Sequence, residues 1–307
     1  MTHPWRLIIL SGLILMGLLM TIGSTNASEF LLHGISPQKI FHNSSTAALA
    51  EAACEGLVSK IDALVKAGAD VNGRGEKNIT PLIWAMTCHN YKGIEALLAH
   101  GANPNQPMEY GQTPTWLAAG GSDPKILPLL LVHGGNPNYY CAECGGTTVL
   151  ENAIDYQRTA NMKLLIKHGA NVNFHGHDEA LNRTAMGGDS AMDSALAAGR
   201  YDYVVYLLLH GYHYKLQVLA NELVTESDHI PKKFRIDINP AWRTRKYKQE
   251  ALRILEKMGI HGHKIPSTIA PPPPGIKPLG GPPLTQKEFE RQQEELDKLL
   301  RKKGLER

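Results

Sequence analysis

The 307-residue sequence lacks the short motifs that mark common enzyme sites. It contains no G-x-S-x-G nucleophile elbow, no H-E-x-x-H zinc motif and no P-loop. It also has little excess charge, with 32 Lys and Arg against 29 Asp and Glu and a formal net charge of +3. These absences disfavour catalysis, and the charge balance gives no general reason to expect nucleic-acid binding.

Long apolar runs are scarce as well. The only one of note, residues 7–22, follows Arg6 and precedes a small-residue cleavage site that ends at Ala27. We therefore predict a signal peptide over residues 1–27, with cleavage before Ser28 and export of the rest of the chain. No Cys directly follows the run, which disfavours a lipoprotein. The run is short for a bilayer span, and an uncleaved inner-membrane anchor is the alternative.

A repeated phrase dominates the rest of the sequence. Gly-Ala-Asn-Pro-Asn at 101–105 has counterparts at 68–72, 134–138 and 169–173 and a degenerate copy from Gly211, so the copies are 33, 33, 35 and 42 residues apart. A second phrase starts 21 residues before each Gly. It begins at Thr80, Thr113, Thr148 and Ser190, and is reduced to Ala-Ala-Leu at 47–49. This fixed offset indicates a repeated structural unit.

Each part of the unit predicts an element. Thr or Ser can cap a first helix, and Pro is suited to the position after it. Five residues on there is always an Ala, small enough for close helix packing: Ala52, Ala85, Ala118, Ala153 and Ala195. A turn residue and a Leu-rich second helix follow, and the Gly of the first phrase can take the left-handed conformation that ends this helix.

This pattern resembles ankyrin repeats over about residues 44–215. The resemblance implies an all-α solenoid of helix-turn-helix-finger units. We expect a lead-in over 28–46, five repeats over 47–215, a degenerate capping repeat over 216–260, a Pro-rich linker over 261–284 and a charged C-terminal helix over 285–307. The thin apolar seam of that last helix consists of Phe289, Leu296, Leu299 and Leu300. It could dock on the solenoid or on a partner, or stay solvated.

The resemblance also implies that a concave groove, made of finger tips and the exposed side of the first helices, binds a protein partner. Carried over to this chain, the groove positions are Glu76, Lys77, Ile79, Thr87, Glu109, Tyr110, Gln112, Asp155 and Tyr156. Nearby tips add Met108, Tyr139, Tyr140 and Phe174. Tyr and Met are enriched in interface cores, although single exposed aromatic residues are also common without function.

The chain has four cysteines. Cys141 and Cys144 lie in the third finger, where a turn brings them within disulfide range, and we predict that they are paired after export. A redox function is disfavoured because no helix in a βαβ context follows them. Cys54 and Cys88 fall on successive first helices, expected about 10 Å apart. We expect no bridge there unless the degenerate first repeat is displaced, so this pairing stays open.

Several other residues have a simple structural interpretation. Trp84 is expected in the core. Trp116 stands where ankyrin repeats usually carry a His after Thr-Pro-Leu, which puts the finger hydrogen bond of that His in doubt. His175-Gly176-His177 and His261-Gly262-His263 are weak metal-ligand patterns, and we expect no metal site. From 232 to 257 there are nine Lys or Arg against three acidic residues. This segment suits an acidic partner, lipid headgroups or simply a solvated helix face.

Together these observations predict a non-catalytic protein-binding scaffold or inhibitor without cofactor, nucleic acid or small-molecule substrate. The resemblance to exported ankyrin proteins implies the periplasm, with a membrane tether through residues 7–22 if the signal is uncleaved. One alternative is an immunity protein that neutralises a secreted toxin such as a lipase effector. A second is a metal- or redox-handling protein that uses the His-Gly-His pairs or Cys141 and Cys144.

Overall fold

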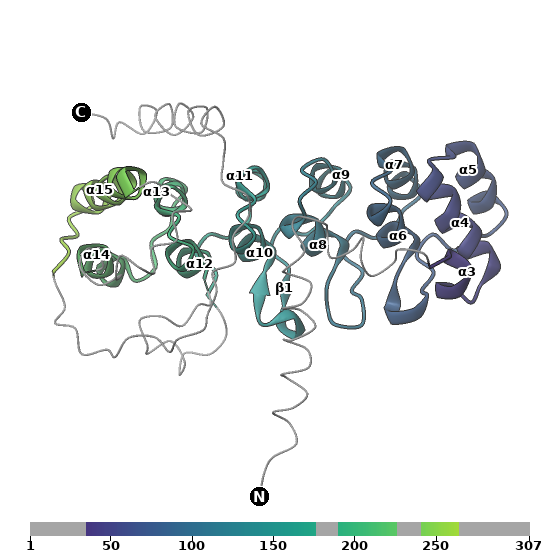
Figure 1. Cartoon of the computed structure of the whole chain (residues 1–307), viewed down its shortest axis with the longest axis horizontal. Helices are drawn as coiled ribbons and strands as arrows, with labels where there is room; N and C mark the ends of the chain where they lie inside the picture. Colours follow the sequence, from purple (N-terminus) through teal and green to yellow (C-terminus); the bar gives the residue numbers. More distant parts are fainter. Residues whose placement is uncertain (1–34, 176–189, 226–240, 264–307) are drawn as a thin grey trace, which may run out of the picture. The chain divides into compact units, whose positions relative to one another are not determined.

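The computed structural model describes residues 35–175, 190–225 and 241–263, and their regular secondary structure is almost entirely helical (Figure 1). They contain thirteen α-helices, two 3₁₀ turns and one two-stranded ribbon. The predicted all-α class is therefore confirmed. The chain divides into two compact units: the first runs to Glu109 and includes Gly121–Gly135, and the second comprises Tyr110–Gly120 and the residues from Asn136 onward.

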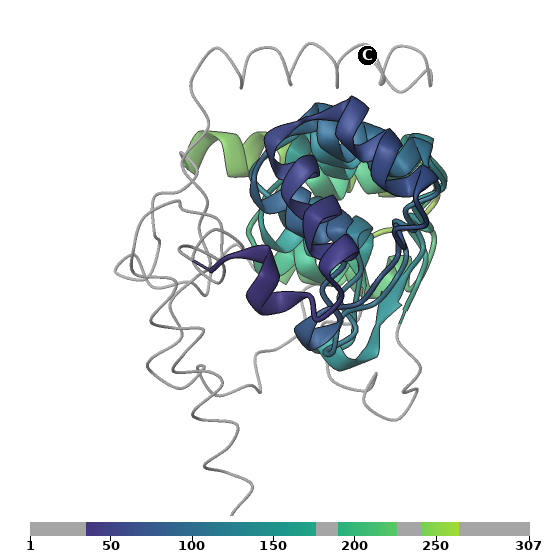
Figure 2. The ribbon, with the colours of Figure 1, turned by 90° about the vertical axis from the view of Figure 1, so that its right-hand side faces the viewer.

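The first unit consists of helix pairs separated by extended fingers. Its elements are α3 (Pro37–Ile40), α4 (Ser44–Glu55), α5 (Val58–Lys66), η1 (Glu76–Asn78), α6 (Pro81–Thr87), α7 (Tyr91–Ala99) and α9 (Ile126–Val132). The second unit contains α8 (Pro114–Gly120), β1 (Tyr140–Cys141), η2 (Ala142–Cys144), β2 (Thr147–Thr148), α10 (Val149–Asp155), α11 (Thr159–Lys167), α12 (Ala191–Ala197), α13 (Tyr201–Leu209), α14 (Leu216–Thr225) and α15 (Ala241–Lys257). In each unit the fingers extend to one side of the helix pairs (Figures 1 and 2).

The predicted caps start the first helices. The hydroxyl of Thr80 accepts from the Ile83 amide at 3.3 Å, and Thr148 and Glu151 form a reciprocal capping box. The first repeat has lost this Thr, and Asn43 caps α4 in its place, accepting from the amides of Ser45 and Thr46. As a result α4 begins at Ser44 and is about one turn longer than the other first helices.

The repeated Ala residues lie at the centre of each unit. Four of the five are 0% exposed, and Ala118 is 4% exposed. In the first unit, α3 adds Ile40 to a core cluster with Phe41, Ile83 and Trp84. Trp84 is 5% exposed, which confirms its predicted place in the core. Close packing of small residues explains why helices of adjacent repeats stack tightly.

The Asn that ends each finger phrase connects neighbouring fingers, a function that the sequence analysis did not assign. In the second unit, Asn138 donates to the Gly169 carbonyl at 3.0 Å and accepts from the Asn171 amide at 2.7 Å. Asn173 bridges to Gly211 and His213 in the same way, at 2.9 and 2.8 Å. Each Asn thus fixes the spacing between two fingers and, with it, the separation of their tips.

The C-terminal part of the second unit ends the stack. Helices α13 and α15 pack together, and α14 packs on α15 through buried Leu219, Leu223 and Ile254. The backbone of His261 and His263 is bound to α14, because Gln217 donates to the His261 carbonyl and Asn221 accepts from the His263 amide. Among the described residues, no helix is long and apolar enough to cross a membrane. The predicted signal peptide, linker and C-terminal helix lie outside the described ranges.

Candidate protein-interaction surface

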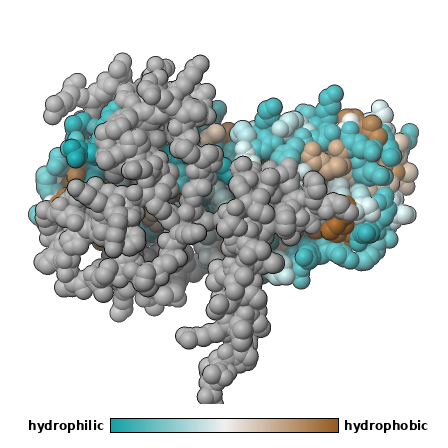
Figure 3. Space-filling view, in the orientation of Figure 1, coloured by the Kyte–Doolittle hydropathy of each residue, from teal (hydrophilic) through white to brown (hydrophobic). Residues whose placement is uncertain are grey.

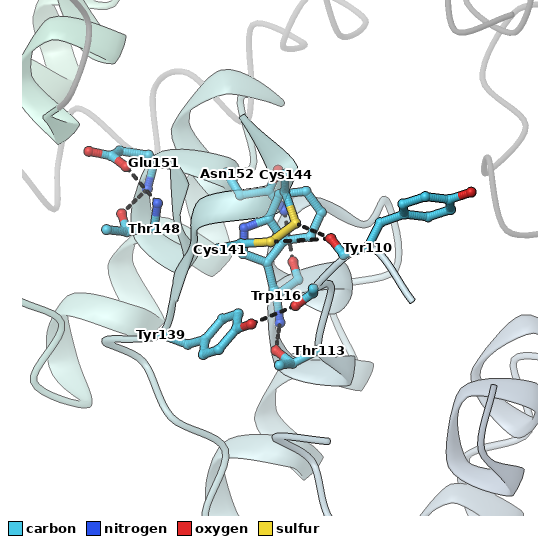
Figure 4. The surroundings of a disulfide bond; sticks show 10 residues. Tyr110, Thr113, Trp116, Tyr139, Cys141, Cys144, Thr148, Glu151 and Asn152 are labelled. Atoms are coloured by element: carbon cyan, nitrogen blue, oxygen red, sulfur yellow. Dashed lines mark hydrogen bonds between the residues drawn. A yellow bond between two sulfur atoms is a disulfide. The ribbon is translucent and has the colours of Figure 1, made fainter. Parts of the chain in front are cut away.

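The third finger is held by two kinds of cross-link (Figure 4). Strands β1 and β2 pair antiparallel, with Tyr140 opposite Thr148, and η2 lies between them. Cys141 and Cys144 are joined as a disulfide with their Cα atoms 5.2 Å apart. The Tyr139 hydroxyl donates to the Gly111 carbonyl at 2.6 Å. These bonds tie the segment at Gly111 to the finger and restrict its motion.

Tyr139 therefore has a structural function that the sequence analysis did not assign, since it was expected only as an exposed contact. Its side chain is half-buried, and burial raises the pKa of its hydroxyl, with a further contribution from the nearby Glu143. Its bond to Gly111 also answers the doubt raised by Trp116. The buried indole N–H of Trp116 has no acceptor among the described residues, and Tyr139 and the disulfide hold this finger instead.

Aromatic side chains from the fingers of the second unit form two ring contacts. Tyr140 and Phe174 lie 5.3 Å apart between ring centroids, and His175 stacks on Tyr214 at 4.1 Å. Tyr110 is 57% exposed, and its ring points away from the disulfide (Figure 4). We call these five residues the aromatic edge. The structure thus brings Tyr140 and Phe174, both predicted from sequence, into contact, and it adds a second pair, His175 and Tyr214, that the sequence analysis had not assigned to the binding surface.

In the first unit the predicted tips are mainly polar. The Glu109 amide donates to the Lys77 carbonyl at 3.0 Å, which joins two adjacent fingers and leaves the side chains of Glu76, Lys77 and Glu109 exposed. Met108 is half-buried against the core cluster. On the face of this unit seen in Figure 3, apolar residues form small patches separated by hydrophilic ones. The most exposed of the predicted aromatic residues, Tyr110, belongs to the second unit.

Ile79 is a correction to the predicted binding surface. It is only 5% exposed and belongs to the core cluster with Ile83 and Trp84. The 3₁₀ turn η1 ends just before Ile79 and turns its side chain inward, onto the first helices. An apolar side chain of this size gains free energy from such burial, so the position contributes to the core and not to an exposed surface.

The predicted first-helix residues lie at helix ends. The Thr87 hydroxyl donates to the Trp84 carbonyl at 2.7 Å, which completes the last turn of α6. Asp155 and Tyr156 end α10, and burial raises the pKa of both side chains. Tyr156 packs so closely on α8 that a side chain at Gly120 would meet its ring. Gln112 is half-buried and lies two residues before the start of α8.

Cys54 and Cys88 lie much closer together than the usual spacing of stacked helices predicts. The two residues are joined as a disulfide, and their Cα atoms are 5.3 Å apart. Gly93 explains this approach: it has no side chain, and a Cβ there would collide with the backbone carbonyl of Ala53. The end of α4 therefore comes much closer to the turn after α6 than two helix axes normally come. Sequence spacing alone did not reveal this contact.

No cluster of three or more His, Cys, Asp or Glu residues suited to a metal ion occurs within the described ranges. His175 donates from Nδ1 to the Asn173 carbonyl at 2.9 Å and stacks on Tyr214. Its predicted companion His177 lies outside the described residues. In the other pair, the backbone of His261 and His263 connects to α14.

The turn before α9 contains a carboxylate whose ionisation we expect to affect stability. Asp123 is 14% exposed and accepts bonds from Tyr91 at 2.7 Å, His89 at 2.9 Å and the Lys125 amide at 3.0 Å. Burial alone would raise its pKa, but these bonds outweigh burial and lower the pKa below the ordinary 3.8. The charged form is thus favoured by folding.

Acidification should remove the contribution of ionised Asp123 to the stability of the fold. This contribution is fully present above pH 3.8, the ordinary pKa of an Asp side chain, and is lost as the pH falls through the lower pKa of Asp123 in the folded state. We expect wild type to be more stable than Asp123→Asn at pH 6, and the difference to shrink steadily below pH 4, as measured by urea unfolding. A difference that stays constant from pH 6 to pH 2 would contradict this assignment.

Comparison with known families supports this description of the fold. A family model described as ankyrin repeats, in three copies, matches residues 15–108. No curated protein matches the chain. The match and the helix-pair-and-finger units support an ankyrin-repeat protein, and the fold is an all-α ankyrin-repeat solenoid. Ankyrin repeats in turn suggest a protein-interaction scaffold, with a protein as partner.

Proposed function

We propose that the chain is a non-catalytic scaffold or inhibitor that holds a protein partner on its aromatic edge. The observation that carries this proposal is the contact between Tyr140 and Phe174 at a finger that a disulfide closes, with the exposed Tyr110 next to that disulfide. Tyrosine supplies a large contact area and a polar group, and it is enriched among residues that dominate binding energy. A scaffold of this class would act by occupying surface, without chemistry.

The cross-links in the finger favour tight binding. A loop that must become ordered on binding loses conformational entropy, which weakens the complex. Here the segment beside Tyr110 is already held by the Tyr139 hydroxyl, and the tip is closed between Cys141 and Cys144. The tip therefore has less conformational freedom to lose when a partner docks.

Two features support action in the periplasm. The run at 7–22 has the composition of an export signal. The four cysteines form two pairs at disulfide distance, which is rare in proteins of a reducing cytosol. A blocking function against a secreted toxin, the narrower alternative, would use the same edge and would be recognised by the identity of the partner. N-terminal sequencing tests export: a mature chain starting at Met1 would contradict it.

Truncating the edge should weaken the complex strongly. We expect Tyr110→Ala with Tyr140→Ala to reduce affinity for the partner by tens-fold or more, because each large interface aromatic typically contributes about 2 kcal/mol. Thermal unfolding should change little, since both side chains lie outside the Leu and Ala core. The matched control is Val132→Ala, which removes a side chain that is 75% exposed on α9. It should alter neither affinity nor melting.

The partner can be captured first by a photo-crosslinking residue introduced at position 110, with position 132 as the control. An adduct at 110 but not at 132, formed in the exported compartment, would support the edge. If the double Tyr variant binds normally while Arg245→Ala with Lys246→Ala loses binding, the binding surface is instead the basic face of α15, where both side chains are exposed.

A further inference from the structure

A groove of about 390 Å³ lies between α11 and α13, the second helices of adjacent repeats in the second unit. It is separate from the aromatic edge, which is built from finger residues. Ala160, Lys163, Leu164 and Lys167 line it from one face of α11. Tyr206 and His210, one turn apart, line it from the end of α13. The floor is thus partly apolar and the rim is basic.

Two hydrogen bonds tie the helices together at one end of this groove. The hydroxyls of Thr159 and Tyr203 are hydrogen-bonded at 2.6 Å, and Arg200 donates to Thr159 at 3.3 Å. Directly after Thr159, Ala160 offers a small side chain to the lining of the groove.

The rim is rigid and basic. The Lys163 amine lies 5.6 Å from the centre of the Tyr206 ring, and that ring stacks on His210 at 4.0 Å. His210 donates from Nδ1 to the Tyr206 carbonyl at 2.8 Å, which fixes the ring orientation. None of the residues that line the groove is acidic. A complementary ligand should therefore present an apolar ridge with carboxylates beside it.

We propose that the occupant of this groove is the chain's own C-terminal segment, residues 285–303. The sequence predicts a helix there, and the segment lies outside the described residues. At 3.6 residues per turn, Phe289, Leu296 and Leu300 fall on one face of such a helix. Carboxylates flank this face on both sides, at Glu288, Glu290, Glu295 and Asp297, and Arg291 and Lys298 lie opposite it. One cation, Lys303, falls beside the C-terminal end of the apolar face.

The groove and the predicted C-terminal helix are complementary in both apolar and charged residues. The Leu ridge matches Ala160 and Leu164, and the flanking carboxylates match Lys163 and Lys167. Burial of the ridge supplies the attraction, and the charges set the orientation of the helix. An isolated helix of this length is only marginally stable in water, so docking would also stabilise it.

The linker is long enough for this contact within one chain. The described part of the chain ends at residue 263, next to α14, and α15 packs directly on α13. Residues 264–284 number 21 and are rich in Pro, so they can extend to about 60 Å at 3.1 Å per residue. The groove beside α13 is about two helix spacings from α14, or roughly 20 Å.

Hydrogen exchange of the full-length chain tests the proposal. We expect the backbone amides of 289–300 to be protected in wild type, because an undocked helix of this length would exchange rapidly. Lys163→Glu with Lys167→Glu should speed their exchange about tenfold, since two attractive pairs become repulsive. Glu295→Lys with Asp297→Lys should do the same without touching the solenoid. Combining all four substitutions should restore protection.

The matched control is Lys60→Glu with Lys66→Glu, which reverses two exposed lysines on α5, the second helix of another repeat. It should leave exchange in 289–300 unchanged. Rapid exchange in wild type, an equal effect of the control, or failure of the four-fold variant to recover would each overturn the proposal. Protection that rises with protein concentration would overturn it in favour of docking onto a second copy of the chain.

Discussion

Replacing Asp202 by Ala should destabilise the protein by about 3–5 kcal/mol, as expected when a buried ion pair loses one partner. Arg200 is 3% exposed, and its guanidinium binds the Asp202 carboxylate through two bonds of 2.8 and 2.7 Å. Burial alone would lower the pKa of Arg200, but Asp202 outweighs burial and raises it. Without Asp202 a cation would remain buried beside the Tyr203 ring, 3.7 Å away. Urea unfolding measures the loss.

Two variants show whether the buried charge is the cause. Glu250→Ala breaks an ion pair with Arg253 whose Arg side chain is 39% exposed, and it should cost less than about 1 kcal/mol. Arg200→Met combined with Asp202→Ala removes both charges, and we expect it to regain most of the lost stability. If the double variant is as unstable as Asp202→Ala alone, lost packing and not an unpaired charge is responsible.

Removing the Cys54–Cys88 bridge should cost about 3.5–4 kcal/mol. The bridge joins residues 34 apart, and in the chain-entropy description a loop of that length restricts the unfolded chain by about this amount. The Cys141–Cys144 bridge spans only three residues, so its removal should cost about 1–2 kcal/mol. The measurement is denaturant unfolding of Cys54→Ala with Cys88→Ala beside Cys141→Ala with Cys144→Ala.

Reduction provides the internal control for both bridges. A reductant should destabilise wild type by nearly the sum of the two effects, and should change the Cys54→Ala, Cys88→Ala variant only by the smaller one. Equal losses in the two paired variants would show that loop length does not govern these bridges. The finger variant should in addition weaken partner binding, because the tip that carries Tyr140 would no longer be closed.

The helix pairs were predictable because their signals are local. The Thr or Ser at position 80, 148 or 190 caps a helix through its own next turn, and the Gly at 68 or 101 permits a positive φ that ends one. A fixed spacing then repeats the same pair of helices, and neighbouring repeats stack because a single helix pair cannot bury its apolar face. Part of the proposed binding surface follows as well, since Tyr110, Tyr140 and Phe174 were expected at finger tips from the repeat pattern.

The errors have one origin: they depend on distances between residues of different repeats. Ile79 was predicted exposed because its finger was considered without α3 and the helices on which it packs. The Cys54–Cys88 pair was judged too distant from an average helix spacing, whereas Gly93 permits a closer local approach. His175 and Tyr214 were separate in sequence and became a stacked pair only in the folded chain.

By itself the sequence determined the class of fold, the order of the paired helices and most of the residues that cap or end them, because caps, Gly and apolar periodicity act within a few residues. Only the tertiary structure decided which side chains pair across repeats: the Asn bridges between fingers, the buried Arg200 and Asp202, the aromatic edge and the groove beside Lys163. The physical reason is that such contacts depend on inter-helix distances to within about 1 Å, and these distances result from packing the whole stack rather than from any one repeat.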